Sequence, residues 1–251
     1  MAASSSDERR RLDVTLVERG IAPTRARARD AILRGAIVVA GETARRPAMM
    51  VAADVPIEAH DPAGRYVSRA ALKLVAGLDH FGYDPAGLRV LDIGASSGGF
   101  TEVLIERGAE RVYAVDVGHD QLHHRLRDHP AVRMREGLNA RDLAAEHVHG
   151  TVGAIVSDVS FISLRLALPA ALALAAPGAW GVFLVKPQFE VGRGAIGKGG
   201  IVRDPQAGRN AADGIADWMA SRPGWTVDGL IDSPITGAGG NHEYLLGARH
   251  A

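Results

Sequence analysis

The chain has 251 residues, of which 47% are hydrophobic and 23% are charged, a composition that excludes a disordered protein. It contains no cysteine, which excludes a disulfide framework, a thiolate metal site and a cysteine nucleophile. The 29 basic and 29 acidic residues cancel, but residues 9–46 hold ten arginines and four carboxylates and therefore carry a net charge of +6. A basic segment on an otherwise mildly acidic chain indicates a module that binds a polyanion.

Two stretches bear on secretion and membrane insertion. The opening MAASSSDERR has no apolar segment and contains acids, so we do not expect a signal peptide. The twenty residues from Leu166 to Val185 carry no charge, about the length that spans a bilayer. However, Pro169, Pro177 and Gly178 interrupt them and predict a short helix, a turn and a strand. We therefore expect a cytoplasmic protein without a membrane partner.

The basic segment predicts two helices and a hairpin. Leu12 and Leu16 share a helical face that ends at Gly20, and Thr24 can cap a second helix that ends at Gly35. The run AIVVAG then predicts a short strand that ends in a glycine turn. Two helices and a hairpin in about sixty residues predict a small α+β domain with a core of its own.

Residues 1–62 resemble the S4-like RNA-binding domain in their RLD, TR and RGAIVVAG spacing. In that family a helical pair and a β-turn present basic residues to RNA, so the resemblance implies that the polyanion is RNA. Arginines beside phosphates would supply affinity that depends on salt and little on base sequence. A plain solvated helix face would show the same charges. The residues that we expect to contact RNA are Arg11, Arg25, Arg27, Arg29 and Arg34.

After a linker at residues 63–68, short apolar runs alternate with helical patterns through residues 69–251. This alternation predicts a parallel sheet covered on both faces, in which ligands bind at the carboxyl ends of the strands. We expect helices at 66–79, 100–108 and 166–175, and strands at 89–94, 111–117, 131–137, 153–161 and 180–185, with Glu243 on the last strand of the sheet.

Polar residues stand where four of these strands end. Asp92 opens the glycine-rich stretch DIGASSGGF, in which Ser96 replaces the middle glycine of a dinucleotide fingerprint. Asp116, Asn139 and Asp158 follow the next three strands. An acidic residue after the second strand of such a sheet binds a ribose. Each of these residues could be a cap, but their convergence on one edge predicts a nucleoside site, and the glycine stretch suits a cationic ligand without phosphate.

Lys186 ends the apolar run GVFLV, in a chain that has three lysines and twenty-six arginines. A lysine at this position indicates ammonium chemistry rather than charge alone, although capping of an exposed strand end is the alternative. A second lysine, Lys198, lies in GRGAIGKGG, which we interpret as a flexible loop over RNA or a plain surface loop.

Seven motifs in order resemble the TlyA family of ribosomal RNA 2′-O-methyltransferases: YVSRAALKL, DIGASSGGFTEVL, YAVDVGHDQL, NARDL, SDVSFISL, LVKPQFEVGRG and GNHEYLL. The resemblance implies an S4-like domain followed by an FtsJ-like, Rossmann-like class I methyltransferase domain with a mostly parallel sheet. It also implies S-adenosylmethionine as cofactor, no metal, and a cytidine ribose of ribosomal RNA in a ribosomal subunit as substrate.

Carried over by motif, the family's catalytic tetrad falls on Lys73, Asp158, Lys186 and Glu243. If Glu243 faces inward, it needs a lysine partner. The residues that we expect to bind the cofactor are Asp92, Gly94, Ala95, Ser96, Gly98, Gly99, Phe100, Asp116, Val117, Asn139 and Asp158.

The sequence also bears on other methylation reactions and on two functions of a different class. Methylation of cytosine at C5 needs a cysteine, and methylation of base amines goes with an Asn/Asp-Pro-Pro-aromatic motif where this chain reads DVSF. A membrane-active haemolysin, the activity to which the TlyA name is linked, lacks an uninterrupted span or a basic amphipathic helix here. A non-catalytic RNA-binding protein of ribosome assembly would not need an intact tetrad.

Overall fold

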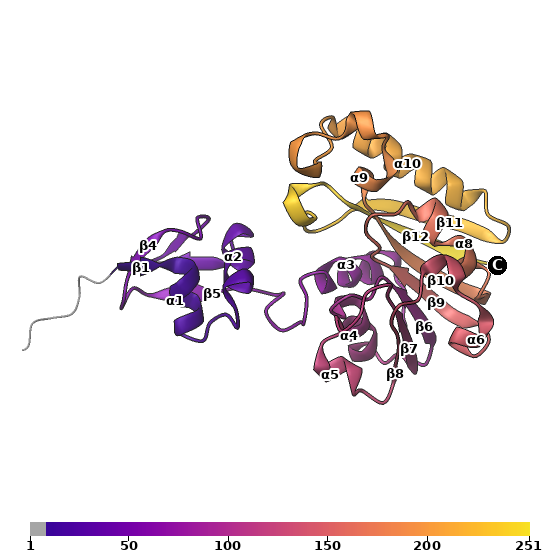
Figure 1. The fold of residues 1–251 in the computed structure, drawn as a ribbon, viewed down its shortest axis with the longest axis horizontal. Coiled ribbons are helices and arrows are strands. Elements are labelled where there is room, and N and C mark those ends of the chain that lie inside the picture. Colours follow the sequence, from indigo (N-terminus) through magenta and orange to yellow (C-terminus); the bar gives the residue numbers. More distant parts are fainter. Residues whose placement is uncertain (1–8) are drawn as a thin grey trace, which may run out of the picture. The chain divides into compact units, whose positions relative to one another are not determined.

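The computed structural model describes residues 9–251 (Figure 1). Contacts within the chain divide it into two compact units, the first ending at Arg65 and the second running from Tyr66 to Ala251. Each unit has apolar cores formed from its own residues.

The first unit is a small α+β domain. Helices α1 (Leu12–Glu18) and α2 (Arg25–Leu33) pack through Leu12, Leu16, Ala28 and Ile32, all of which are fully buried. Thr24 caps α2, because its hydroxyl accepts a hydrogen bond from the Arg27 backbone N–H (3.3 Å). The strands are β1 (Arg9–Arg11) paired with β4 (Met50–Ala52), and the antiparallel set β3 (Glu42–Thr43), β2 (Ile37–Val39) and β5 (Ile57–Ala59). The two predicted helices and the predicted hairpin are present.

The second unit is built on a seven-stranded sheet with the order β11-β12-β10-β9-β6-β7-β8. Strands β8, β7, β6, β9 and β10 are parallel, and β12 runs antiparallel between β10 and β11. The predicted mostly parallel α/β sheet is therefore confirmed. The strands are β6 (Arg89–Ile93), β7 (Arg111–Val115), β8 (Val132–Arg135), β9 (Val152–Ser157), β10 (Ala175–Val185), β11 (Trp225–Asp232) and β12 (Tyr244–His250).

Helices cover both faces of this sheet. Successive residues of a strand point to opposite faces, so each central strand contributes side chains to two apolar cores. Val90 and Val182 face α3 (Ala71–Phe81) and α4 (Gly99–Glu106) in one apolar core. Leu91 and Phe183 belong to the other core, which contains α7 (Leu164–Ala167), α8 (Pro169–Leu172) and α10 (Pro205–Ala220). The remaining helical segments are α5 (His124–Arg127), α6 (Ala145–Val148), α9 (Pro187–Glu190), η1 (Ala140–Asp142), η2 (Arg193–Ala195), η3 (Lys198–Gly200) and η4 (Ala238–Gly240).

Some predicted bounds were wrong for local reasons. The helix expected from residue 66 begins at Ala71, and the Val67 backbone N–H ahead of it donates to Glu102 Oε2 (2.6 Å) instead. The helix expected at 166–175 is divided at Pro169, which has no N–H to continue α7. Strand β10 begins at Ala175 and has an irregular register before Trp180, whereas β9 ends at Ser157. Helix α10 and strand β11 were not predicted.

Candidate active site

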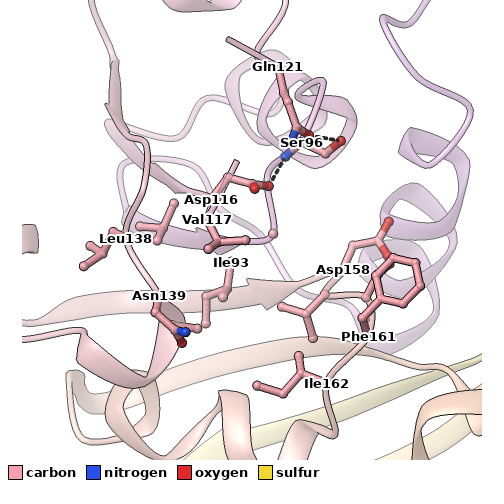
Figure 2. Close-up of a pocket in the computed structure, with 15 residues that line it drawn as sticks. Ile93, Ser96, Asp116, Val117, Gln121, Leu138, Asn139, Asp158, Phe161 and Ile162 are labelled. Carbon is pink, nitrogen blue, oxygen red and sulfur yellow. Dashed lines mark hydrogen bonds between the residues drawn. The ribbon is translucent and has the colours of Figure 1, made fainter. Parts of the chain in front are cut away.

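The carboxyl edge of the sheet is hollowed where the strand order reverses. The chain passes from β6 outward to β7 and β8, and then returns to place β9 on the other side of β6. Open α/β sheets bind ligands at this switch point. A cavity of about 530 Å³ lies here (Figure 2), lined by residues from the ends of β6, β7 and β9 and from the segment after β8.

Asp116, directly after β7, is held by backbone donors on both carboxylate oxygens. The Ser96 N–H donates to Oδ2 (2.8 Å) and the Gly118 N–H donates to Oδ1 (2.7 Å). The Ser96 hydroxyl donates to Gln121 Oε1 (3.1 Å), which joins the glycine-rich turn to the segment after β7. Figure 2 shows Ser96, Gln121 and Asp116 grouped on one wall of the cavity. This geometry fixes a carboxylate that could accept hydrogen bonds from the two hydroxyls of a ribose.

The other walls of the cavity are largely apolar. Ile93, Val117, Leu138 and Ile162 line it, and Val117 is 67% exposed. Among its described lining residues the charged ones are Asp116 and Asp158, and both are carboxylates. Apolar walls suit an adenine ring, and a purely anionic lining suits a cation and disfavours a pyrophosphate.

A smaller cavity of about 140 Å³ adjoins the first and shares Gly94, Ser96, Asp158 and Ser160 with it. Lys186, directly after β10, lines this smaller cavity. Its Nζ lies 2.6 Å from Asp158 Oδ1, at an angle outside the hydrogen-bond range, and donates to the Ser160 hydroxyl at 2.8 Å. An ammonium has three N–H donors, and the Ser160 hydrogen bond uses one of them, so donors remain for a ligand in the cavity.

Lys73 and Glu243 form a second ion pair, buried rather than lining either cavity. Lys73 Nζ is 2.5 Å from Glu243 Oε2, and the two residues are 6% and 3% exposed. The expectation that an inward-facing Glu243 pairs with a lysine is thus met by Lys73. Glu243 lies immediately before β12 rather than on it, so its predicted place on the strand was wrong by one residue.

Two glycines leave room for the ion pair of Lys73 and Glu243. Gly77 lies one helical turn after Lys73, and a Cβ there would be 2.8 Å from Val182 Cγ1 on β10. Helix α3 therefore packs closely on the sheet and turns Lys73 toward it. A Cβ on Gly237 would lie 2.1 Å from Glu243 Oε1, so this backbone leaves room for the carboxylate.

Asp92 is fully buried and accepts a hydrogen bond from the Thr101 hydroxyl at 2.6 Å. Its Oδ1 has no hydrogen-bond partner. Burial raises the pKa of Asp92 to about 7, the Thr101 hydrogen bond opposes this rise, and the carboxylates of Asp158 and Asp116 add to it. Asp92 lines neither cavity, and its hydrogen bond with Thr101 joins β6 to α4.

The structure divides the predicted cofactor residues into three groups. The main cavity is lined by Gly94, Ser96, Asp116, Val117, Asn139 and Asp158, and the smaller one also by Ala95, Gly99 and Phe100, whereas Asp92 and Gly98 line neither. Sequence reasoning missed Gln121, Ser160 and Phe161. Phe161 could have been noticed as the aromatic that follows Asp158 in SDVSF. It has a positive φ of 65°, is 90% exposed, and its ring centroid is 5.2 Å from that of Phe189.

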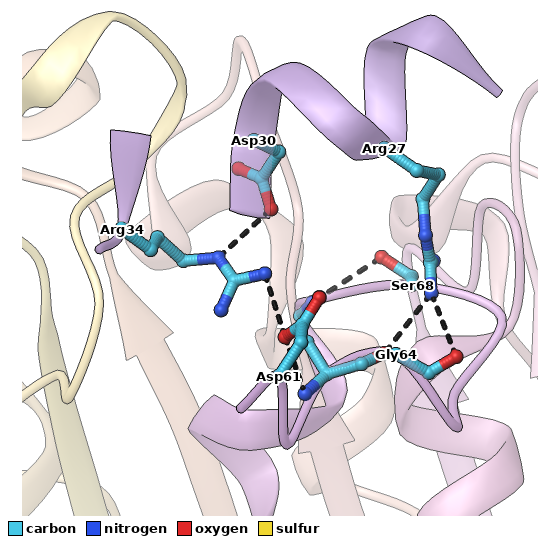
Figure 3. A network of polar contacts seen from close by, with 8 residues as sticks. Arg27, Asp30, Arg34, Asp61, Gly64 and Ser68 are labelled. Carbon is cyan, nitrogen blue, oxygen red and sulfur yellow. Dashed lines mark hydrogen bonds and ion pairs between the residues drawn. The ribbon is translucent and has the colours of Figure 1, made fainter. Parts of the chain in front are cut away.

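The arginines expected to contact RNA differ in their surroundings within the first unit. Figure 3 shows Arg34 between two carboxylates: Nε donates to Asp30 (2.9 Å) and an Nη donates to Asp61 (2.8 Å). Arg27 donates to the carbonyl oxygens of Ala63 and Gly64. Arg11 and Arg25 both pair with the buried Asp13, whose pKa the Arg11 hydrogen bond lowers to about 2. Arg29 is exposed on α2, and Lys198 is exposed on η3.

Two protein-family models match this chain. The FtsJ-like methyltransferase model matches residues 66–250, and the S4 domain model matches residues 10–56. The chain is 45% identical over 242 residues, 96% of its length and 90% of the relative's, to the 16S/23S rRNA (cytidine-2′-O)-methyltransferase TlyA of Mycobacterium tuberculosis. The chain belongs to the TlyA family of FtsJ-like methyltransferases.

Other members of the TlyA family carry a different name. Hemolysin A of Brachyspira hyodysenteriae is 39% identical over 94% of this chain and 98% of its own. A solved structure of a candidate hemolysin from Streptococcus thermophilus matches with a TM-score of 0.74 and 37% identity, over 99% of this chain and 90% of that one. Between residues 9 and 251, the TlyA-family fold of this chain has no helix that is long and apolar enough to cross a membrane. The same residues contain no cluster of three His, Cys, Asp or Glu side chains that could hold a metal.

Proposed function

We propose that this protein transfers a methyl group from S-adenosylmethionine to the 2′-hydroxyl of a cytidine in ribosomal RNA. The observation that carries the proposal is the junction of the two cavities, where the Lys186–Asp158 pair faces a nucleoside-sized cavity with an anionic lining. The name of the Mycobacterium tuberculosis relative supplies the substrate class, and the S4 domain gives the protein an RNA-binding module.

The donor set of the main cavity fits S-adenosylmethionine. Asp116, already oriented by the N–H groups of Ser96 and Gly118, would bind the ribose hydroxyls. Val117, Leu138 and Ile162 would enclose the adenine. The Asn139 Oδ1 already accepts from the Arg141 backbone N–H and Nε, so its Nδ2 would donate to the polar edge of the ring. When bound, the cofactor supplies an electrophilic methyl group on a sulfonium.

Lys186 would act on the acceptor oxygen. The Asp158 carboxylate and the Ser160 hydroxyl hold its ammonium in one place, so an N–H not used by Ser160 can donate to a ribose 2′-oxygen in the smaller cavity. That donor would stabilise the negative charge that develops on the oxygen as its proton passes to water and the methyl group is transferred. Displacement at the methyl carbon requires the 2′-oxygen to be aligned with the bond that breaks. The fixed N–H donor of Lys186 would also hold the 2′-oxygen in that orientation. The buried Lys73–Glu243 pair would keep the ends of α3 and β12 in register behind the site.

Phe161 would position the target base. Its side chain is 90% exposed beside Asp158 and Ser160 and contacts the ring of Phe189, so little of it is packed in the protein core. Its backbone has a positive φ, which costs energy in a residue other than glycine. Aromatic faces stack on bases that have been moved out of an RNA helix.

The direct test is transfer of labelled methyl groups to ribosomal subunits that lack the modification, followed by mapping of the modified nucleotide. We expect label on a cytidine ribose with the wild-type protein and none with Lys186→Ala. Asp116→Ala should weaken S-adenosylmethionine binding by about 1–3 kcal/mol, the usual loss for hydrogen bonds to a charged group. Label on a base, or tighter binding of NAD than of S-adenosylmethionine, would contradict the proposal.

A further inference from the structure

The glycine-rich segment Gly197–Val202 is a closed loop rather than an open tether. Ile196 and Val202 form an antiparallel bridge, the Gly197 N–H donates to the Ile201 carbonyl (2.7 Å), and the Arg203 N–H donates to the Ala195 carbonyl (3.1 Å). The loop exposes Lys198 and Ile201 to solvent. From Val191 to Arg203 the sequence holds three basic residues and no acid, in a body whose other charges are mildly acidic.

A single buried side chain from a distant segment holds this loop. Asn241 is 4% exposed; its Oδ1 accepts from the Val202 N–H (3.0 Å) and its Nδ2 donates to the Gly200 carbonyl (2.9 Å). One planar amide thus satisfies a backbone donor and a backbone acceptor on the loop. A carboxylate of the same size could accept but not donate, and glutamine would be longer by one methylene.

Asn241 also belongs to the segment that delivers Glu243. The Gly237 N–H donates to the Asn241 backbone carbonyl (2.9 Å), and the Ser233 N–H donates to the Glu243 carbonyl (2.9 Å). The side chain of Asn241 therefore connects the cationic loop with the turn that leads into the buried Lys73–Glu243 pair. A buried amide with both groups satisfied is a rigid connection, because breaking it leaves backbone groups unpaired.

We propose that Asn241 is a substrate-positioning residue: its buried amide fixes the loop Gly197–Val202 on the active-site segment, so that Lys198 meets a phosphate of the RNA in a defined place. The inference rests on the proposed function insofar as the substrate is RNA. A phosphate contact from a fixed lysine lowers KM for RNA, since less loop entropy is lost on binding.

The test compares wild type, Asn241→Asp, Asn241→Ala and the control Asn210→Ala, which removes an exposed amide paired with Gln206 on α10. Three quantities are measured: the rate of tryptic cleavage after Lys198, KM and kcat for ribosomal subunits, and the Kd of S-adenosylmethionine. For both Asn241 variants we expect cleavage at least about fivefold faster, KM about tenfold higher, kcat within about threefold and Kd within about twofold. The control should match wild type.

A double-mutant cycle separates positioning from general damage. If Asn241 acts through Lys198, the double variant Lys198→Ala/Asn241→Ala should have a KM no higher than the worse single variant. Unchanged cleavage would show that the amide does not hold the loop. Faster cleavage with a wild-type KM, additive effects on KM, or joint loss of kcat and cofactor binding would each overturn the positioning role. A wild-type protein that methylates no ribosomal RNA would refute the proposed function instead, and the cleavage rates would still test the connection.

Discussion

The surroundings of Lys186 fit an ammonium group and not a larger cation. Its ammonium lies between the Asp158 carboxylate and the Ser160 hydroxyl at 2.6 and 2.8 Å, in a site where its side chain is 11% exposed. A guanidinium is planar and wider, so it cannot place a single N–H donor in the space that the Lys186 ammonium occupies. We therefore expect Lys186→Arg to lose at least about a hundredfold in single-turnover rate, nearly as much as Lys186→Ala, with cofactor and RNA binding unchanged.

Lys198→Arg is the matched control for this substitution, because an exposed lysine that meets a phosphate tolerates the exchange of one cation for another. Its activity should stay within about twofold of wild type. If Lys186→Arg retained more than roughly a third of the wild-type rate, direct action of Lys186 on the hydroxyl would be excluded.

The raised pKa of the buried Asp92 should make the free energy of unfolding depend on pH. Burial raises its pKa to about 7 in the folded protein, above the value of an exposed aspartate, so the folded state binds the proton more tightly than the unfolded chain. Between about pH 4 and pH 7 the free energy of unfolding should therefore fall as pH rises, and level off above it. Asp92→Asn keeps an acceptor for Thr101 and carries no charge, so it should remove this fall and be more stable at pH 8 by on the order of 2–4 kcal/mol.

Urea unfolding from pH 4 to pH 8 measures this difference between wild type and Asp92→Asn. The exposed carboxylate Asp54 supplies the control, and Asp54→Asn should follow the wild-type curve. Parallel curves for wild type and Asp92→Asn would mean that Asp92 is ionised in the folded state at all these pH values.

At the level of elements, the close packing of α3 on the sheet decides where Lys73 points. Gly77→Ala would place a Cβ 2.8 Å from Val182 Cγ1, so α3 must move outward or β10 must shift. We expect a loss of about 1–3 kcal/mol in the free energy of unfolding, the usual cost of overpacking, together with reduced activity. Thermal unfolding and methyl transfer measure the two effects.

Gly208→Ala on α10 is the same exchange in a helix with room for it, since the nearest atom to its Cβ would be 3.6 Å away. It should gain roughly 0.5–1 kcal/mol from helix propensity. Equal effects of the two alanines would show that α3 does not depend on this contact to hold Lys73.

Helix α2 of the S4 domain and Arg34, which directly follows it, carry arginine side chains with two different tasks. Arg34 is paired with Asp30 and Asp61 (Figure 3), so Arg34→Ala leaves two half-buried carboxylates without their cation and should lower stability by about 1–3 kcal/mol. Arg29 is exposed on α2, so Arg29→Ala should weaken RNA binding and reduce its salt dependence while stability stays the same. Melting curves and binding isotherms at several salt concentrations distinguish the two. A loss of RNA affinity in both variants at unchanged stability would contradict this division.

The elements that could be predicted are those whose pattern is local. The apolar runs of β6, β7 and β8 are bounded by glycine or polar residues, and Thr24 signals the start of α2. Helix α10 was missed although the sequence signals it, because Asp204 and Pro205 mark its start and its buried positions, among them Ala212 and Ile215, recur at helical spacing. The ion pair of Lys73 and Glu243 joins residues 170 apart in the sequence. Only the family resemblance suggested that these two residues act together, because no local pattern encodes a contact of that range.

For the whole molecule, the separation of charge leads us to expect that the first unit supplies most of the affinity for RNA and the second unit the chemistry. The net charge of +6 on residues 9–46 lies within the first unit, and both cavities and both lysine–carboxylate pairs lie within the second. The core of the first unit contains residues between Leu12 and Ile57, whereas the cores of the second begin at Tyr66. Affinity for RNA and chemistry can therefore be removed one at a time.

Deletion of residues 1–65 tests this separation, because the cut leaves Tyr66 and every core of the second unit in place. We expect the truncated protein to bind S-adenosylmethionine within about threefold of the full chain, since no described residue of the first unit lines the main cavity. Its methylation of ribosomal subunits should fall by at least about a hundredfold, and its RNA binding should depend less on salt, because several arginine–phosphate contacts are lost and each contributes roughly 0.9 to the slope of log K against log salt. Calorimetry, methyl transfer and binding isotherms between 50 and 200 mM salt, concentrations over which such contacts act, measure these three effects. Methylation of subunits at the full rate by the truncated protein would show that the second unit recognises its RNA without the S4 domain.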